Sequence, residues 1–143
     1  MDKNVADYKN AYIISAENSQ YINVTPVLIT ANMIFTTDGP AVQHEKIGNT
    51  DKVIQQELEK NGIHAEIGKK DDAPDNFDLI VAYYDTWRPD LKKVLDNLEI
   101  VFLSPTGEII ARSTYNYKEV HNYPTPEKEV PKMIKALLKA KPQ

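Results

Sequence analysis

FDLIVAYYDTWRPDL, residues 77–91, is the stretch of this 143-residue chain that decides its fold. Its first part has a nearly continuous apolar centre, which predicts a central β-strand covered on both faces. Its second part holds the chain's only tryptophan, Trp87, with Asp85 and Arg88 beside it. Pro89 then biases the preceding residue toward extended backbone. The stretch therefore predicts a buried strand that ends in a cluster of charged and aromatic side chains.

A helix is predicted before this strand, over NTDKVIQQELEKNG (49–62). Asn49 or Thr50 is a suitable N-cap, and Gly62 stands where a left-handed C-cap belongs. The apolar stripe that would face the core consists of Val53, Ile54 and Leu58.

A second helix is predicted near the end of the chain, over TPEKEVPKMIKALLKA (125–140). Thr125 is its expected cap, and Pro126 suits the first helical position because an N–H there would lack a helical partner. Pro131 lies early enough to be tolerated or to shift the start of the helix by a turn. The core stripe consists of Val130, Ile134, Leu137 and Leu138.

Three further segments are predicted to be extended. AYIISAE (11–17) has a β-branched centre. IHAEIG (63–68) alternates apolar and polar residues, which predicts a strand with one buried face. LEIVFLSPTGEIIARSTYNY (98–117) contains two strand-like runs joined by SPTG, which predicts a hairpin.

Two segments leave alternatives open. YINVTPVLITANMIFTTDG (21–39) is rich in β-branched residues, which favours extended structure. Its Val27, Ala31 and Ile34 also have the spacing of one helical face, so a helix is the second interpretation. PDLKKVLDNL (89–98) has leucines at helical spacing and is either one or two helical turns or a continuing extended segment.

Together these elements predict an α+β fold, α/β-like in its first strand–helix–strand unit. That unit would cross right-handed into a parallel pair, and the later hairpin would add antiparallel strands. The expected architecture is a mixed sheet of about five strands with two main helices packed on one face. Residues 1–10 are expected to be a flexible lead-in, and residues 11–141 a single domain.

Composition excludes several classes of function. The net charge is −4 and the isoelectric point about 5.4, which argues against nucleic-acid binding. The chain has no cysteine, so thiol catalysis, cysteine metal sites and disulfides are excluded. No apolar run is long enough to span a membrane, and the polar start MDKNVADYKN shows no signal peptide.

The sequence gives little support for a catalytic or metal centre. His44, His64 and His121 lack the spacing of metal ligands, and DDAPDNFD (71–78) lacks the glycine of a calcium loop. The serines occupy no nucleophile-elbow context, and the glycines form no phosphate-binding pattern. No cofactor or metal is therefore expected. A small hydrolase that uses Asp85 and a histidine is the least favoured interpretation.

One cluster of candidate residues surrounds the end of the central strand. It could be an interaction surface, because exposed aromatic rings stack on sugars or peptides. The favoured interpretation is architectural, with the indole over the core and the charges fixing where the chain turns. The cluster consists of Tyr83, Asp85, Trp87, Arg88, Asp90, Tyr115 and Tyr117.

The order FDLIVAYYDTWRPDLKKVLDNLEIVFLSPTGEIIARSTY (77–115) resembles a pattern in small bacterial cell-envelope lipoproteins of uncharacterised function. In those proteins an apolar strand ends in an aromatic residue, an aspartate and a tryptophan, and a strand, a glycine-containing turn and an IIA strand follow. The first strand and the helix that ends in LEKNGI fit the same layout. The resemblance covers roughly residues 10–140 and carries structural motifs with no family catalytic residue.

The resemblance implies a non-enzymatic domain of an envelope lipoprotein that binds a protein or an envelope component. Such a domain would lie in the periplasm or at the outer membrane, held by a lipid anchor that is missing from this chain. If Met1 is the native start, a cytosolic or secreted immunity- or adaptor-type interaction protein becomes the interpretation. The stretch 18–47 is longer than expected, could form an extra hairpin, and is where an individual function could reside.

Overall fold

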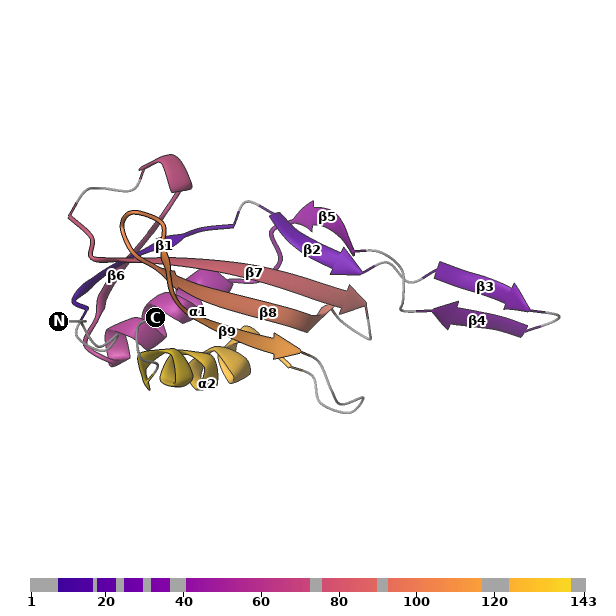
Figure 1. Ribbon diagram of the computed structural model, residues 1–143. Helices are drawn as coiled ribbons and strands as arrows, with labels where there is room; N and C mark the ends of the chain where they lie inside the picture. Colours follow the sequence, from indigo (N-terminus) through magenta and orange to yellow (C-terminus); the bar gives the residue numbers. More distant parts are fainter. Residues whose placement is uncertain are drawn as a thin grey trace.

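A computed structural model describes residues 8–16, 18–22, 25–29, 32–36, 41–72, 76–89, 93–116 and 124–139. Figure 1 shows a sheet with both helices on one of its faces. The elements are, in chain order, β1 (Asn10–Ile14), β2 (Asn18–Ile22), β3 (Thr25–Ile29), β4 (Asn32–Thr36), β5 (Ala41–Glu45), α1 (Thr50–Lys60), β6 (His64–Gly68), the 3₁₀ turn η2 (Lys70–Asp72), β7 (Leu79–Pro89), β8 (Lys93–Leu103), β9 (Ile109–Asn116) and α2 (Pro126–Lys139).

Strand β7 is the centre of a seven-stranded mixed sheet. One edge of β7 pairs in parallel first with β1 and then with β2, and the other edge pairs with β8 in antiparallel fashion. Outside these lie β6 beside β1, β5 beside β2, and β9 beside β8. The sheet is therefore five strand positions wide, because β1 and β2 share one position and β6 and β5 share the next. The α+β prediction is confirmed, including the parallel β1–α1–β6 unit.

The two faces of the sheet differ. Helix α1 packs on β1 and β6, while α2 packs on β8, β9 and α1. Alternate residues of β7, such as Leu79 and Val81, are fully buried beneath these helices. On the other face Ala82 is buried and Ile80 is half-buried, whereas Tyr84 is 61% exposed, so the predicted covering of both faces holds for the apolar centre of β7 and ends at Tyr84. On this face Ala82 pairs with Val101 of β8, and both residues are buried although neither α1 nor α2 covers them.

Both helices end and begin much as predicted. Gly62 has a φ of 83°, and its N–H donates to Glu59 O at 3.1 Å while the Ile63 N–H donates to Leu58 O at 3.0 Å. This pair of bonds is a Schellman motif, which satisfies two terminal carbonyls. Asn49 occupies the N-cap position of α1, but its side chain makes no capping bond. In α2 the predicted cap is confirmed, because the Lys128 N–H donates to the Thr125 side chain at 3.3 Å.

An irregularity in β8 explains the leucine spacing that resembled a helix. Trp87 pairs with Leu95 and Thr86 with Asn97, so Asp96 is an extra residue in the ladder. Such a bulge reverses the alternation of faces on one strand. Leu95 and Leu98 therefore both face the core, fully buried, although three positions separate them. The segment from Lys93 onward is extended, and Asp90 and Leu91 lie outside the described residues.

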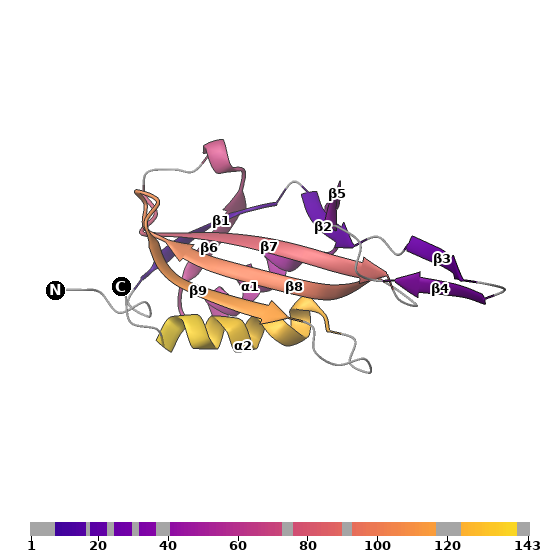
Figure 2. The same ribbon diagram turned by 45° about the vertical axis from the view of Figure 1, so that its right-hand side comes forward.

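The segment between β1 and α1 forms an extra hairpin, and the extended interpretation is confirmed there. β2 pairs with β5 in antiparallel fashion, and β3 pairs with β4 in a separate two-stranded sheet. Figures 1 and 2 show β3 and β4 projecting beyond the end of the main sheet. The same views place the start of β1 at the opposite end of the molecule.

Candidate functional site

The structure brings three of the seven candidate residues together. Tyr83, Asp85 and Trp87 alternate along β7 on the helix-covered face, and each is at most 5% exposed. Arg88 follows on the opposite face, where its Nε lies 3.5 Å from Asp96 Oδ1. Tyr115 is half-buried on β9 and packs against the edge of the core. Asp90 and Tyr117 lie outside the described residues.

Asp85 is the hub of a buried hydrogen-bond cluster. Its Oδ2 accepts from the Ser19 hydroxyl and from the Trp87 indole N–H, each at 2.7 Å. The Ser19 oxygen also accepts from the Ile47 N–H at 2.9 Å. Because Ser19 lies in β2 and Ile47 follows β5, the cluster ties both strands at the base of the extra hairpin to the central strand.

The loop before α1 closes over the tryptophan. Gly48 has a φ of 73°, and a Cβ placed on it would lie 3.3 Å from the Trp87 ring. A side chain at this position would meet both backbone strain and close contact with the indole. The glycine thus lets the loop approach the ring and shield Trp87, which is 5% exposed.

A second buried acid lies in the first turn of α1. Asp51 Oδ2 accepts from Ser15 Oγ at 2.9 Å and from Lys46 Nζ at 2.6 Å, and Oδ1 accepts from the Lys52 N–H at 2.8 Å. Burial alone would raise the pKa of Asp51, but these three bonds outweigh it and hold the pKa below 3.8. The stabilisation from this acid is therefore present above the unfolded-state pKa and is lost as the pH falls through the folded-state pKa.

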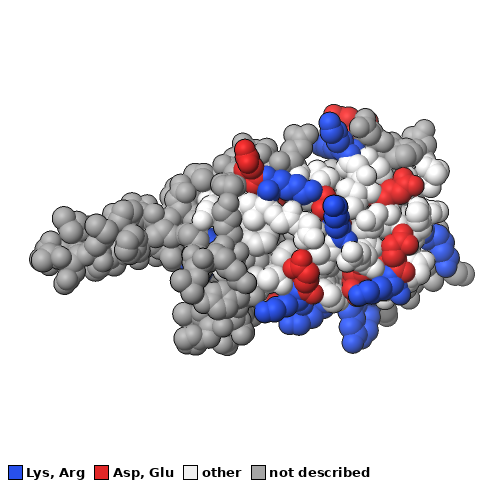
Figure 3. Space-filling view, turned by 180° about the vertical axis from the view of Figure 1, so that it is seen from behind, with Lys and Arg blue, Asp and Glu red and all other residues white. Residues whose placement is uncertain are grey.

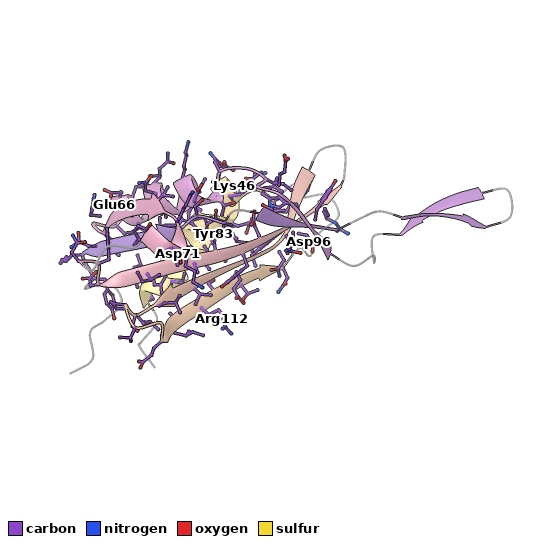
Figure 4. All side chains as sticks on the ribbon, turned by 90° about the horizontal axis from the view of Figure 1, so that it is seen from above. Lys46, Glu66, Asp71, Tyr83, Asp96 and Arg112 are labelled. Atoms are coloured by element: carbon purple, nitrogen blue, oxygen red, sulfur yellow. The ribbon has the colours of Figure 1, made fainter. Side chains whose placement is uncertain are left out.

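Tyr83 lies between the two acids. Its hydroxyl oxygen accepts from the Ala16 N–H at 3.1 Å. Burial raises its pKa to about 12, and the charges of Asp51 and Asp85 add to the rise. Figure 4 shows Tyr83 in the middle of the sheet near Lys46, with Asp96 toward the hairpin end and Glu66 at the opposite end.

Replacement of Tyr83 by phenylalanine is expected to change the alkaline stability of the protein. At pH 7 the variant should lose about 1–3 kcal/mol, because the Ala16 N–H loses its acceptor. In the wild type the unfolded chain ionises Tyr83 near pH 10 while the folded chain holds the proton until about 12, so stability falls across that window. The wild type's advantage over the variant should therefore shrink above pH 10 in urea titrations, and a constant difference from pH 8 to 11 would contradict this account.

The arrangement of these groups differs from that of a nucleophilic site. The Ser19 hydroxyl donates directly to Asp85, whereas a catalytic serine donates to a base that lies between it and the acid. Ser19 is also only 1% exposed, so a substrate has no access to it. The strand register pairs it with His44, whose side chain lies outside the described residues, as does all of His121. His64 is exposed on β6 beside Glu59 and Glu66.

Sequence reasoning did not assign Asp51 or the residues that bond to the two buried acids. Ser15 and Ser19 were considered only as nucleophiles. Lys46 gave no signal in the sequence, and Asp51 gave none beyond its place as an acid in a first helical turn. Within the described residues no group of three or more histidines and acids is placed to hold a metal ion. Among the buried side-chain nitrogen and oxygen atoms of the described residues, the Thr50 hydroxyl oxygen is the one without a hydrogen-bond partner.

The surface outside the cluster carries charges of both signs. Figure 3, which views the molecule from behind relative to Figure 1, shows Lys and Arg interspersed with Asp and Glu over the described part of the surface. Among the described residues, no helix has both the length and the apolar character needed to cross a membrane. Comparison of the chain with models of protein families, with curated proteins and with solved structures found no match.

Proposed function

We propose that this chain is a non-enzymatic binding domain, the part of a cell-envelope lipoprotein that contacts another protein, and that it does so through the β3–β4 hairpin. One observation carries the proposal. Residues 18–37 contain no charged residue, although 27% of the chain is charged, and part of this segment forms a two-stranded sheet apart from the main one. Among the residues that the structure describes, β3 and β4 pair only with each other, and an uncharged hairpin of this kind stands out in a chain so rich in charge.

The physical chemistry of two-stranded sheets supports binding. An isolated hairpin is marginally stable in water and gains stability from further strands or a covering surface. Edge strands that must stay solitary are commonly blunted by charged side chains, and lysine is the commonest choice. The hairpin strands carry no charge, so their sequence suits a strand that another protein covers.

The position of the hairpin favours a protein over a lipid bilayer as its target. The hairpin and the start of β1 lie at opposite ends of the molecule, so an N-terminal tether would direct the hairpin away from the membrane that holds it. In addition, an open sheet edge in hydrocarbon leaves backbone groups unpaired, at a cost of several kcal/mol each.

In this proposal the buried cluster has a positioning role. Asp85 holds Ser19 of β2, and Ser19 holds the Ile47 N–H just beyond β5. Both strands that lead to the hairpin are therefore fixed to β7 at the ends farthest from it, through Ser19 near the start of β2 and Ile47 just beyond β5. A binding element gains affinity when its support is ordered before binding.

A truncated variant tests the proposal. Ile22 and Ala41 are paired, so replacing residues 23–40 by Asn-Gly should close β2 and β5 with a two-residue turn and leave the main domain intact. An envelope protein retained by the immobilised wild type should be lost with the truncated chain. The purified partner should then bind the wild type in calorimetry and fail to bind the variant.

Circular dichroism must show that the truncated chain is folded for this comparison to hold. Equal binding of the partner by both chains would contradict a role for the hairpin. If the wild type instead sediments with phospholipid vesicles and the truncated chain does not, the hairpin is a membrane-contacting element.

A further inference from the structure

The two outer edges of the β3–β4 hairpin are not equivalent. The register pairs Pro26 of β3 with Phe35 of β4. In an antiparallel ladder, opposed residues alternate between pairs that bond to each other and pairs whose N–H and C=O groups point outward. Proline has no N–H, so within a sheet it belongs where that group would face outward. Pro26 and Phe35 therefore form an outward-directed pair.

The same alternation assigns the rest of the hairpin. Val27 and Ile34, one step along, form an inward-bonded pair, and Leu28 and Met33 are again directed outward. The outer edge of β3 consequently lacks an N–H at Pro26. The outer edge of β4 offers the N–H and C=O groups of Met33 and Phe35, and no proline or charge interrupts its five residues.

We propose that β4 pairs in antiparallel fashion with β4 of a second copy of this chain, so that two hairpins form one four-stranded sheet. The inference rests on the proposed role of the hairpin as the binding element and names its partner. A register centred on Ile34 overlaps all five residues of β4 and places Met33 of each copy opposite Phe35 of the other. This arrangement is two-fold symmetric, and each copy presents the same strand.

The blocked edge of β3 suits pairing with one further copy of the chain. A hairpin with two open edges would add copies without limit and form a fibre, whereas a hairpin with one open edge closes after a single pairing. Pro26 interrupts the β3 edge, so the assembly stops at two chains. Like charges directly opposite each other destabilise a strand pair. Because β4 carries no charge, two copies of it can pair without such repulsion.

Proline substitutions on the two edges provide a matched test. Met33→Pro and Leu28→Pro change the two members of one rung, and both remove an outward N–H while leaving the inward bonds of the hairpin in place. In sedimentation equilibrium the wild type should be a dimer. Met33→Pro should weaken the dimer by at least about 30-fold, since each copy loses a backbone bond to the other, and Leu28→Pro should leave it within about threefold.

Cysteine substitutions test the register, because the chain has no native cysteine. In a register centred on Ile34, residue 34 of one copy lies opposite residue 34 of the other, at a Cβ separation that suits a disulfide. Ile34→Cys should therefore form a disulfide-linked dimer on mild oxidation. Val27→Cys, its partner within the hairpin, should not.

The outcomes distinguish this inference from the function on which it rests. A wild type that stays monomeric at about 100 μM, a concentration at which edge pairing of useful strength would be seen, overturns the dimer. A series of larger oligomers, or equal weakening by Leu28→Pro and Met33→Pro, overturns the role of the β4 edge. Truncation-sensitive binding of an envelope protein by a monomer would overturn only the self-pairing, and so would a dimer that survives truncation. Equal binding of an envelope protein by the wild type and the truncated chain would overturn the function on which the inference rests.

Discussion

Replacement of Trp87 by alanine is expected to lower the free energy of unfolding by about 3–5 kcal/mol, the range for truncation of a buried aromatic side chain. The indole is 5% exposed, lies where a Cβ added to Gly48 would be 3.3 Å from the ring, and donates its N–H to Asp85 at 2.7 Å. Removing it leaves a cavity under the loop and takes one donor from a buried carboxyl group. The loss should be measured in guanidinium titrations followed by circular dichroism, because the variant has no tryptophan fluorescence.

Trp87→Phe is the matched control. It keeps an aromatic ring and lacks the N–H that Asp85 accepts, so it should lose less than the alanine variant, about 1–3 kcal/mol. A loss near zero for Trp87→Ala would mean that the indole contributes little to the core. In that case the aromatic end of β7 would become a candidate contact surface.

Patterns that are local in the chain predicted most of the fold. Helix α1 follows from a short apolar stripe and Gly62, and the β8–β9 hairpin follows from two β-branched runs around a turn. These features need only the 3.6-residue and two-residue periodicities and the freedom of glycine at positive φ. The central position of β7 followed in the same way, because its apolar run is long for a strand that pairs on one edge only.

Features that depend on register could not be predicted. The extra residue Asp96 made Leu95 and Leu98 resemble one face of a helix, and only pairing with β7 shows a bulge there. Likewise, no sequence pattern shows that β1 and β2 share one edge of β7. That arrangement is set by which strands compete for an edge, which is a property of the whole sheet.

The candidate cluster shows the same division. The run from Tyr83 to Trp87 was visible in the sequence because its aromatic and acidic residues alternate on one strand. Its partners were not, since Ser19 lies 66 residues from Asp85 and Ser15 lies 36 residues from Asp51. A serine that serves a buried acid at such a distance has the same local sequence as any serine in a strand.

Replacement of Asp85 by alanine is expected to lower the free energy of unfolding by about 2–6 kcal/mol, because two buried donors lose their acceptor and each such loss costs roughly 1–3 kcal/mol. The donors are the Ser19 hydroxyl and the Trp87 indole N–H. Asp85→Asn should cost less, since one amide oxygen can occupy the position of Oδ2 and accept both. Glu99→Ala, an acid on the partly exposed face of the adjacent strand, should stay within about 0.5 kcal/mol of the wild type.

The location of the effect separates a positioning role from a catalytic one. Because Ser19 connects Asp85 to the Ile47 N–H, loss of the acid should loosen β2 and β5 before it loosens the β8–β9 pair. Amide hydrogen exchange in Asp85→Ala should therefore rise first in β2 and β5, and dimerisation or partner binding should weaken with it. An unchanged thermal midpoint together with loss of an enzymatic activity would make Asp85 a catalytic acid. A stability loss spread evenly over the sheet would make it a core residue with no special relation to the hairpin. Only exchange concentrated in β2 and β5 fits the positioning role of the bonds that connect Asp85, Ser19 and Ile47.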